Sequence, residues 1–590
     1  MFLDPRPSLA RARRQVRSDL AADPYLGYIL LGTIVLCGFW LWHRIPSFAT
    51  RDERDRLLDP LVAYARVLED PSLESLRSGV AWGRAPFGAT FYLFGLAVLP
   101  VVVWAILTGE SSAITGLASP NDAFGYYEAW SSTPEWVWTA SLLAVRASML
   151  AFAVGSVYLT YRLGTTLDDR PTGRIAAVIL LGTFGFLMIA HEGGEDMPAL
   201  FFVLLALTLL VEYVETGTRR RFYHASLAGG AAIAFKLTAA PIVPVIVLAY
   251  ILRAWQAPEP SGRALYDPRL FGGGAALGAA VILAGFPTLL VGEAELFLDR
   301  ILHHAARRPN VLSGPDAPIW WWFLRNYASG LGLPVFLTVV LAIPAALWRA
   351  IRTRDGSTGL VIALGAGYIA LFSGWHDFRV HHLLPTVPLL ALLAAGPIER
   401  FRRDRPHIAR PLLAVLVITG GVYAVLGVSG YASMPRDEAT DWLSTNIDNE
   451  SVEVYRSDFQ DAAVPHGVDV RYEFTRRSDS ERCPKYIELT YRDRLILHPG
   501  DRYPDHPAKT GYIRSLLTGE YNYTMVAAFG PQPAGLQPAR QRPGSLRDAL
   551  WAGLIPHSNY YSDEQELTPN QYTAIFERTG TCEARPSPPF

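Results

Sequence analysis

The sequence contains little lysine, little cysteine and almost no net charge. Lysine occurs only at Lys236, Lys485 and Lys509, so nearly all of the 53 basic residues are arginine, a composition typical of a GC-rich prokaryotic genome. The formal net charge of -1 gives no support to nucleic-acid binding, which needs a basic face. Only 18% of the 590 residues are charged and 50% are hydrophobic. A polytopic membrane protein with a soluble part is therefore expected.

Apolar runs recur along the first three quarters of the chain, and most are about long enough to cross a bilayer. The first follows the basic stretch RARRQVRSDL and lacks a small-residue cleavage site, so it is expected to stay as a helix and not to be removed as a signal. We expect a cytoplasmic N-terminus (1–24), a membrane domain (25–430) and an extracytoplasmic soluble domain (431–590). The runs are Tyr25–Ile45, Pro86–Leu107, Val137–Leu163, Arg174–Ala190, Met197–Val214, Ala225–Leu252, Leu270–Gly292, Leu331–Ala350, Gly359–Trp375, His382–Ile398 and Pro411–Gly430.

The arginine-rich stretches between these runs indicate the orientation, because arginine and lysine collect on the cytoplasmic side of membrane proteins. If all of these stretches are inside, Pro86–Leu107 has both ends outside and should be a re-entrant or surface-lying helix. Ala225–Leu252 has both ends inside and should be two short helices with an outer tip near Lys236. The expected fold is an α-helical polytopic membrane protein with about 11 spanning helices plus a juxtamembrane helix.

Four polar clusters then fall on the outer face, namely ATRDERDRLLD, HEGGED, AFKLT and WHDFRVHH. In the first, Asp52 and Glu53 directly follow the first helix, where a general base could accept a proton from an acceptor hydroxyl or amine. The alternative is a solvated amphipathic helix with internal salt bridges. In the second, Glu192, Glu195 and Asp196 open a run that is otherwise nearly charge-free. Because carboxylates are costly to desolvate, this cluster indicates an exposed loop, a cation site or a polar chemical site.

Several motifs, in this order, resemble one known superfamily. An Asp-Glu-x-Arg element directly after the first helix resembles the GT-C polyprenyl-phosphate-sugar glycosyltransferases, in particular the family 39 protein mannosyltransferases and the lipid A aminoarabinose transferases. WGRAPFGATFYL is similar to their Lys-Pro-Pro segment, AVRASMLAFAVGSVYLTYRLG to their second spanning helix, and GEDMPALFFVLLALTLLVEY to their Asp-x-Pro stretch. LAGGAAIAFKLTAAPIVP resembles the Gly-rich helix ending in Lys, and FRVHHLLPTVPLLALLAA resembles the Arg-Tyr-x-x-Pro-x-x-Pro helix entrance with His in place of Tyr. The resemblance covers roughly residues 25–430.

The resemblance implies a site at the outer face. Asp52 takes the position of the catalytic base with Glu53 beside it, and Asp196 that of a second acidic residue. Lys236 is either a phosphate contact that stabilises the leaving group or a snorkelling residue at a helix end. No cofactor is expected to be required, although a divalent cation at the acidic loops stays an alternative. The residues expected to bind substrate are Arg84, Glu195, Lys236, Arg379, His381 and His382.

The implied activity is that of an inverting membrane glycosyltransferase. The donor would be a sugar, such as a mannose-like hexose, on a dolichyl or undecaprenyl phosphate carrier, and the acceptor a protein, glycan or lipid at the outer face of the plasma membrane. A flippase or transporter of lipid-linked sugars is the first alternative, with the acids and Lys236 as coupling groups. It predicts inverted repeats, and none is evident. A non-catalytic scaffold or sensor is the second alternative.

The C-terminal segment changes in composition after Gly430. VRYEFT, YIELTYRDRLILHPG, YNYTMVAAFG and QYTAIFE are strand-like runs, which predict a small α/β or mostly β domain. Cys483 and Cys582 both lie in this segment and could form a disulfide if the segment is outside the cytoplasm.

Overall fold

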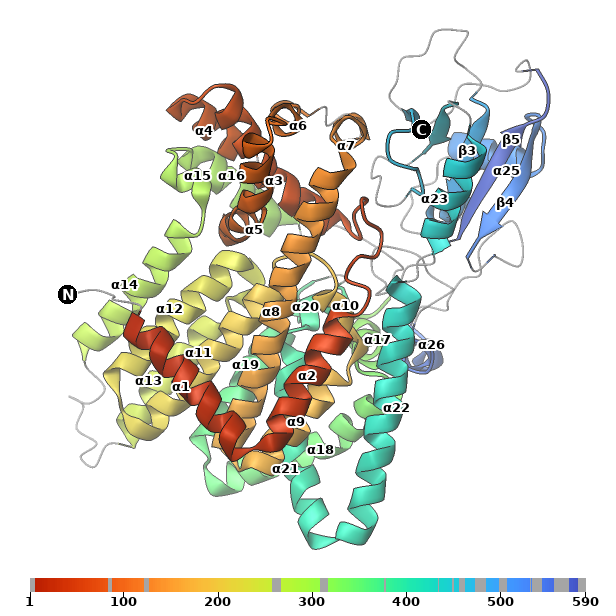
Figure 1. Cartoon of the computed structure of the whole chain (residues 1–590). Coiled ribbons are helices and arrows are strands. Elements are labelled where there is room, and N and C mark those ends of the chain that lie inside the picture. The colour runs from red at the N-terminus through yellow and green to blue at the C-terminus, as the bar shows by residue number, and fades with distance from the viewer. Residues whose placement is uncertain are drawn as a thin grey trace.

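The computed structural model is mostly helical and ends in a small β-sheet domain (Figure 1). Arg84, Cys483 and Cys582 lie outside the described residues, so the expected substrate contact at Arg84 and the expected disulfide are not addressed by the structure. The residues that the structure describes are 6–82, 88–120, 127–256, 267–307, 317–375, 378–432, 435–447, 450–455, 462–472, 484–497, 507–530, 532, 544–556 and 572–581.

The described part of the chain is a multi-pass membrane protein. By length and hydropathy, seven of its helices can cross a membrane, and nine if each of two bent pairs counts as one span. Each apolar run of the sequence coincides with one helix or with consecutive helices. The seven are α5 (Gly88–Leu107), α8 (Glu135–Leu167), α11 (Asp196–Thr216), α13 (Ile242–Trp255) with the turn η2 (Leu237–Ala239), α18 (Leu333–Thr353), α19 (Gly356–Ser373) and α22 (Pro406–Ala432). The bent pairs are α1 (Arg6–Ala22) with α2 (Pro24–Gly38), and α9 (Arg170–Leu181) with α10 (Phe184–Ala190). Shorter helices complete the bundle, namely α12 (Arg219–Phe235), α14 (Pro268–Ala284), α17 (Ile319–Leu331), α20 (Val380–Leu383) and α21 (Thr386–Asp404).

Four helices begin in the same way at the bundle end that lies far from the C-terminal domain. Asp23, Asp169, Asp267 and Asp355 are the N-caps of α2, α9, α14 and α19, and each side chain accepts a hydrogen bond from a backbone N–H of the first turn. A proline follows in the first turn of α2, α9 and α14, where its missing N–H costs nothing. These caps fix where the chain re-enters the bundle.

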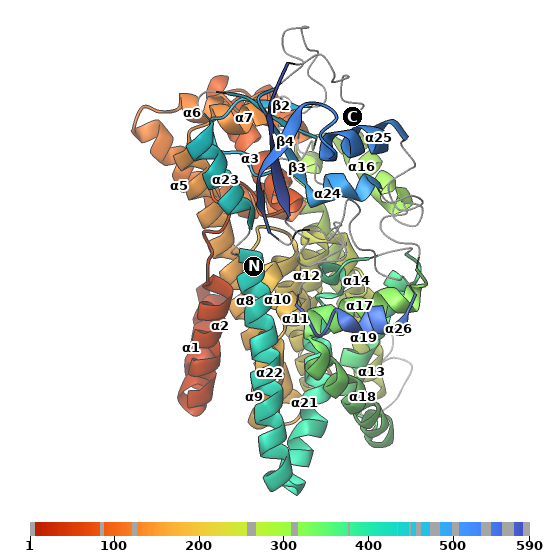
Figure 2. The same cartoon turned by 90° about the vertical axis from the view of Figure 1, so that its right-hand side faces the viewer.

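The opposite end of the bundle carries a layer of helices in which α5 lies (Figures 1 and 2). The Tyr92 hydroxyl, near the start of α5, donates to Ala284 O at the end of α14 (3.2 Å), and Tyr64 of α3 donates to Gly95 O (3.0 Å). The first half of α5 is thereby attached to α14 and α3. Because α5 is long and apolar enough to cross a membrane, its re-entrant or surface-lying course stays a prediction. The other helices of the layer are α3 (Arg51–Glu69), α4 (Leu73–Trp82), α6 (Ser112–Thr115), α7 (Tyr127–Ser132), α15 (Pro287–Leu290) and α16 (Ala294–Arg307).

The predicted broken hairpin is present. Helix α12 ends at Phe235, Lys236 has an extended backbone, and the chain turns back through η2 into α13. At the far end of the hairpin, an Arg253 side-chain N–H donates to Val214 O (3.2 Å), which ties the end of α13 to the end of α11. Lys236 is therefore held at the tip, on the side of the layer that contains α3 to α7, which we call the α3–α7 layer.

The C-terminal domain is an α/β unit, as predicted. Its five strands lie in the order β2-β1-β3-β5-β4, in which β1 is parallel to β2 and β3, and β5 is antiparallel to β3 and β4. Apolar side chains of β3 and β5 pack against α25, which buries one face of the sheet. The elements are α23 (Pro435–Asn446), β1 (Val452–Val454), β2 (Val470–Tyr472), β3 (Tyr486–Thr490), α24 (Tyr491–Arg494), α25 (Pro507–Leu517), β4 (Tyr523–Phe529), α26 (Leu546–Trp551) and β5 (Thr573–Arg578).

The segment around α26 leaves the sheet and packs on the bundle beside α17 (Figures 1 and 2). Leu333 N–H donates to Gly553 O (2.8 Å), and the buried Tyr423 hydroxyl lies 2.8 Å from both Ala552 O and Ser329 O. A Cβ on Gly553 would lie 2.8 Å from Ala328 O, so this close approach needs a glycine. The C-terminal domain is thereby joined to α17, α18 and α22.

Candidate active site

Four segments meet beneath the α3–α7 layer. They are the start of α3, the loop between α10 and α11, the tip at Lys236, and α20. The four polar clusters of the sequence fall on these segments, so the structure brings together Asp52, Glu53, Glu195, Asp196, Lys236, Arg379 and His381.

Glu53 is fully engaged in a buried ion pair. Thr50 caps α3 by accepting from Glu53 N–H (3.2 Å), which fixes the direction of the first turn. Arg146 of α8 binds the Glu53 carboxylate through two N–H groups (2.7 and 2.8 Å), and both side chains are 0% exposed. The same carboxylate accepts from Ala49 N–H (2.8 Å) and Gly193 N–H (2.9 Å). Four hydrogen bonds occupy the two oxygens, so this group joins α3, α8 and the α10–α11 loop.

The approach of Gly193 to Glu53 explains part of the HEGGED sequence. A Cβ on Gly193 would lie 2.7 Å from Val145 Cγ1 and 3.2 Å from Glu53 Cγ. Any side chain at this position would push the loop away from α3 and α8. The glycine therefore sets the distance at which the acids of the loop face Asp52.

The Asp52 carboxylate differs from its neighbour. It is partly buried, and in the described part of the chain no hydrogen bond or ion pair holds it. Burial raises the pKa of Asp52, but the positive charges of Arg56, His381, Lys236 and Arg379 outweigh this effect and lower the pKa to about 2. Asp52 is thus an ionised carboxylate that is available to a substrate.

Two buried ion pairs fix the surroundings of Asp52. Arg56, one turn along α3, binds Glu195 through two N–H groups (2.9 and 3.2 Å). Lys236 Nζ lies 2.5 Å from Asp196 Oδ1, and both residues are less than 10% exposed. These pairs connect α3, the start of α11 and the hairpin tip, so Glu195 and Asp196 each have a cation partner and Asp52 has none bound directly.

Sequence reasoning assigned no role to Arg56 or Tyr368, and it named Glu192 only as a member of the acidic cluster. Arg56 could have been found from its i+4 spacing to Asp52 on one helix face. Glu192 Oε2 is buried and has no hydrogen-bond partner, and burial, with the negative charges of Asp52, Asp196 and Glu53, raises the pKa of Glu192 well above its usual value. Tyr368 of α19 is 0% exposed, its hydroxyl has no hydrogen-bond partner among the described residues, and it lies within electrostatic reach of Asp196.

Helix α20 contributes residues with different surroundings. His382 is buried; its Nδ1 accepts from Arg379 N–H (2.9 Å), and its ring packs near Phe372 and Trp375. These contacts stabilise the turn and assign the neutral ring with the proton on Nε2. His381 and Arg379 are partly exposed, and their charges act on Asp52.

Oxygen and nitrogen ligands for a cation are close together here, but Glu53, Glu195 and Asp196 are each bound to a basic side chain. Within the residues that the structure describes, no group of three or more His, Cys, Asp or Glu side chains is placed to hold a metal ion. The carboxylates of Asp52, Glu195 and Asp196 face the cations Arg56, Lys236 and Arg379, with His381 as a fourth basic group. The arrangement can accept an additional anion and can remove a proton at Asp52.

Comparison with known proteins gives a partial match. Residues 137–260 match the family model described as dolichyl-phosphate-mannose-protein mannosyltransferase. No curated protein matches the chain. Solved structures that match along most of the chain include ArnT from Cupriavidus metallidurans bound to undecaprenyl phosphate (TM-score 0.48, 12% identity, 95% of this chain and 99% of that chain). Others are the Archaeoglobus fulgidus oligosaccharyltransferase (0.46, 12%, 94% and 88%) and the mycobacterial arabinofuranosyltransferase AftD (0.44, 15%, 95% and 40%). From α8 through α13 the chain is thus similar to the dolichyl-phosphate-mannose-protein mannosyltransferases, which confirms its resemblance to the GT-C superfamily of glycosyltransferases.

Proposed function

We propose that the protein transfers a sugar from a polyprenyl-phosphate carrier to an acceptor, and that Asp52 is the general base. The observation that carries this proposal is the difference between the contacts of Asp52 and those of Glu53, two adjacent residues in the first turn of α3. Glu53 is saturated by Arg146 and two backbone N–H groups, whereas Asp52 has no bound partner among the described residues and lies among four basic groups. The motif order and the family match over residues 137–260 support the same reaction class.

The proposed step is a single displacement that inverts the anomeric carbon. The acceptor oxygen or nitrogen forms a bond to this carbon, the bond from the carbon to the phosphate oxygen breaks, and the acceptor proton passes to the Asp52 carboxylate. The electron pair leaves with the carrier phosphate, which gains one negative charge. Lys236, Arg379 and His381 are placed to stabilise that charge.

The charges at the site link donor binding to the strength of the base. Without donor, the basic groups keep the pKa of Asp52 near 2, so its affinity for a proton is low. A bound phosphate would neutralise part of their field, and the pKa of Asp52 would then rise toward that of an ordinary carboxyl group. In this proposal Asp52 becomes an effective base only when the donor phosphate is present, which protects the site from unproductive proton transfer.

Glu192 has a supporting part in this scheme. Burial and the neighbouring negative charges raise its pKa and so favour the neutral form of its carboxyl group, which adds no negative charge next to the phosphate. A protonated carboxyl group can also donate a hydrogen bond to a sugar hydroxyl or a phosphate oxygen. Glu53 and Glu195, by contrast, position α3 and α11 and do not contact substrate.

The test is a transfer assay in membranes with labelled polyprenyl-phosphate sugars, comparing the wild type with Asp52→Asn and Asp196→Asn at matched expression. The exposed Glu110→Gln, in the same helix layer, serves as the control. Asp52→Asn should reduce the rate by a factor of about 10² to 10⁴, the usual contribution of a general base, and Glu110→Gln should leave it unchanged. Full transfer by Asp52→Asn would refute the base assignment.

The buried Asp196–Lys236 pair also suits a second candidate, a flippase or transporter of lipid-linked sugars, because intramembrane ion pairs serve there as coupling groups. An assay in proteoliposomes distinguishes the two functions. A transporter moves labelled carrier lipid between leaflets without any change in the sugar-carrier bond. A glycosyltransferase cleaves that bond on one side.

A further inference from the structure

Helix α1 has no part in the proposed site, and it lies at the other end of the bundle. It is bent by 112° from α2, so it does not continue the first span. At the corner, the fully buried Asp23 caps α2 and accepts from the Tyr161 hydroxyl and from Arg174 Nε (2.8 Å each). The corner is therefore fixed, and α1 runs across the bundle instead of along it (Figure 1).

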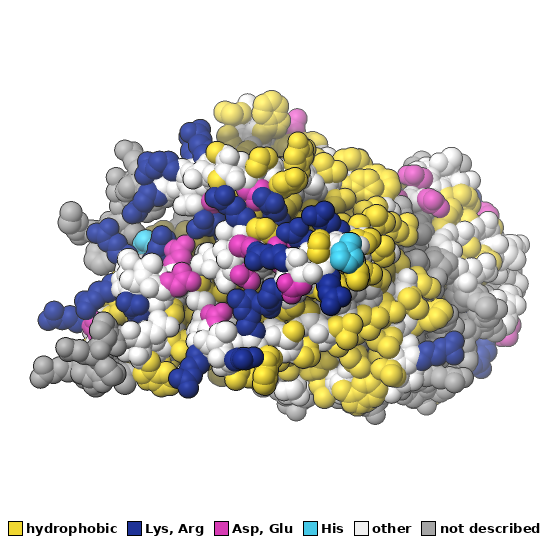
Figure 3. All heavy atoms as spheres, turned by 90° about the horizontal axis from the view of Figure 1, so that it is seen from below, with side chains coloured by type: hydrophobic (Ala, Val, Ile, Leu, Met, Phe, Trp, Pro, Cys, Tyr) yellow, Lys and Arg dark blue, Asp and Glu magenta, His cyan; other side chains and the backbone are white. Residues whose placement is uncertain are grey.

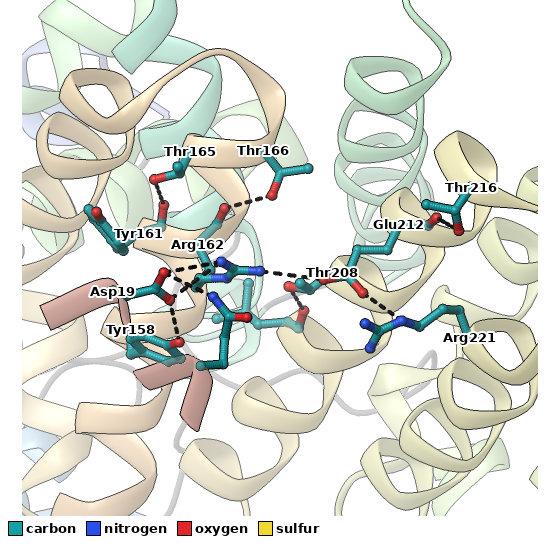
Figure 4. Close-up of polar contacts among 12 residues, drawn as sticks. Asp19, Tyr158, Tyr161, Arg162, Thr165, Thr166, Thr208, Glu212, Thr216 and Arg221 are labelled. Carbon is teal, nitrogen blue, oxygen red and sulfur yellow. Dashed lines mark hydrogen bonds and ion pairs between the residues drawn. The ribbon is translucent and has the colours of Figure 1, made fainter. Parts of the chain in front are cut away.

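A chain of polar contacts holds α1 against three other helices (Figure 4). Asp19 of α1 accepts from the Tyr158 hydroxyl of α8 (2.7 Å) and pairs with Arg162 of the same helix (3.4 Å). Arg162 in turn pairs with Glu212 of α11 (3.6 Å), and Glu212 pairs with Arg221 of α12 (2.9 Å). These contacts orient one face of α1 toward the bundle and leave the others open.

The open faces of α1 are basic. Arg13, Arg14 and Arg17 are exposed, and no ion pair involves them in the part of the chain that the structure describes. Arg11 lies close enough to His224 of α12 for its charge to act on that residue, together with the charges of Arg220 and Arg221. The arginines of α1 and those at the start of α12 therefore form one basic surface.

The position of this surface identifies its partner. Figure 3 shows many Lys and Arg side chains on this end of the molecule, with fewer Asp and Glu side chains among them and hydrophobic side chains at the border. Arginines at the boundary of an apolar belt lie at the depth of lipid head groups, where they attract anionic lipids. Since the same arginines predict a cytoplasmic location, the relevant leaflet is the cytoplasmic one.

We propose that α1, with the first turn of α12, is a binding surface for the phosphate head groups of anionic phospholipids. We define the surface by Arg11, Arg13, Arg14, Arg17 and Arg220. The helix lies along the membrane plane, its arginines contact several head groups at once, and Asp19 keeps it in register with the bundle. This surface is independent of the sugar-transfer site, which lies at the opposite end.

The test measures lipid binding to the full-length protein in detergent by native mass spectrometry, with phosphatidylglycerol and phosphatidylcholine as probes. Three proteins are compared: the wild type, the α1 variant Arg13→Gln/Arg14→Gln/Arg17→Gln, and a control with the same charge change, Arg352→Gln/Arg405→Gln/Arg410→Gln. The control residues are exposed and lie in or next to the α18–α19 and α21–α22 connections. All six side chains are exposed, so both variants should fold; unfolding temperatures in detergent check this.

The wild type should bind phosphatidylglycerol more tightly than phosphatidylcholine. The affinity of the α1 variant for phosphatidylglycerol should be at least about tenfold lower than that of the wild type. The control should retain it, and added salt should weaken binding in the wild type more than in the α1 variant. Equal binding of the two lipids by the wild type would overturn the proposal. So would an α1 variant that binds phosphatidylglycerol like the wild type, or a control that loses as much, because net charge alone would then explain the preference.

Discussion

Replacing Glu53 by glutamine tests whether this residue positions the site or acts as its base. The carboxylate accepts four hydrogen bonds, two of them from Arg146, at a place with no exposed surface. Glutamine keeps the shape, but its amide NH₂ would face N–H donors, so at least two bonds are lost and the Arg146 charge is left uncompensated. Removing one partner of a buried pair costs about 3–5 kcal/mol. Glu53→Gln should therefore lower the stability of the whole protein.

The assay is the apparent unfolding temperature of the purified protein in detergent at a fixed scan rate, for Glu53→Gln, Arg146→Met and the double variant. The double variant removes the unpaired charge, so its loss should be smaller than the sum of the single losses by at least about 2 kcal/mol. Glu69→Gln, an exposed position at the end of the same helix, is the control and should cost less than about 1 kcal/mol. A Glu53→Gln protein as stable as the wild type, but without transfer activity, would refute the positioning role.

Two further predictions concern pH and the C-terminal segment. Arg379→Gln removes one of the charges that lower the pKa of Asp52, so the acid limb of the transfer rate should move to higher pH, while the exposed Arg352→Gln should not move it. The direction follows from the lowered pKa of Asp52, because the basic groups stabilise its ionised form. This stabilisation of the folded protein is complete above pH ~3.9, the pKa of Asp in the unfolded chain, and it is lost as the pH falls toward 2. An unchanged acid limb in Arg379→Gln would contradict the electrostatic account. Tyr423→Phe removes a buried hydroxyl that lies 2.8 Å from both Ser329 O and Ala552 O, so it should cost about 1 kcal/mol and speed hydrogen exchange in residues 544–556; exchange there at the wild-type rate would show that α26 is held by other contacts.

The membrane-spanning part of the fold could be predicted from the sequence because hydropathy and arginine placement act locally along the chain. The hairpin at Lys236 followed from the requirement that basic stretches share one side. The C-terminal α/β domain followed from alternating strand patterns. No local pattern indicated that α26 returns to the bundle, since that contact depends on backbone groups of Gly553 and Leu333.

The sequence predicted which residues lie at the candidate site, but not which of them form ion pairs or hydrogen bonds with one another. Asp52, Asp196 and Lys236 were found from motif order, and the structure places them together. The resemblance assigned the base to Asp52, but no local pattern indicated that Glu53 is held in an ion pair, because its partner Arg146 lies 93 positions away along the chain. Nor could it indicate that Glu195 is bound to Arg56 or that His382 caps α20, since both are tertiary or turn contacts of polar residues that look exposed in the sequence.

The strand order of the C-terminal domain has a consequence for biogenesis. Strand β5 lies between β3 and β4, yet among the described elements it follows both of them and α26 in the sequence. Until β5 has been synthesised, β3 and β4 have no partner between them and the sheet cannot close. By then α17, α18 and α22 have left the ribosome, so the surface that receives α26 is available before the last strand arrives. The C-terminal sheet is therefore completed after the helices that receive α26 have been made, and a chain without β5 would leave the sheet open on an otherwise inserted bundle.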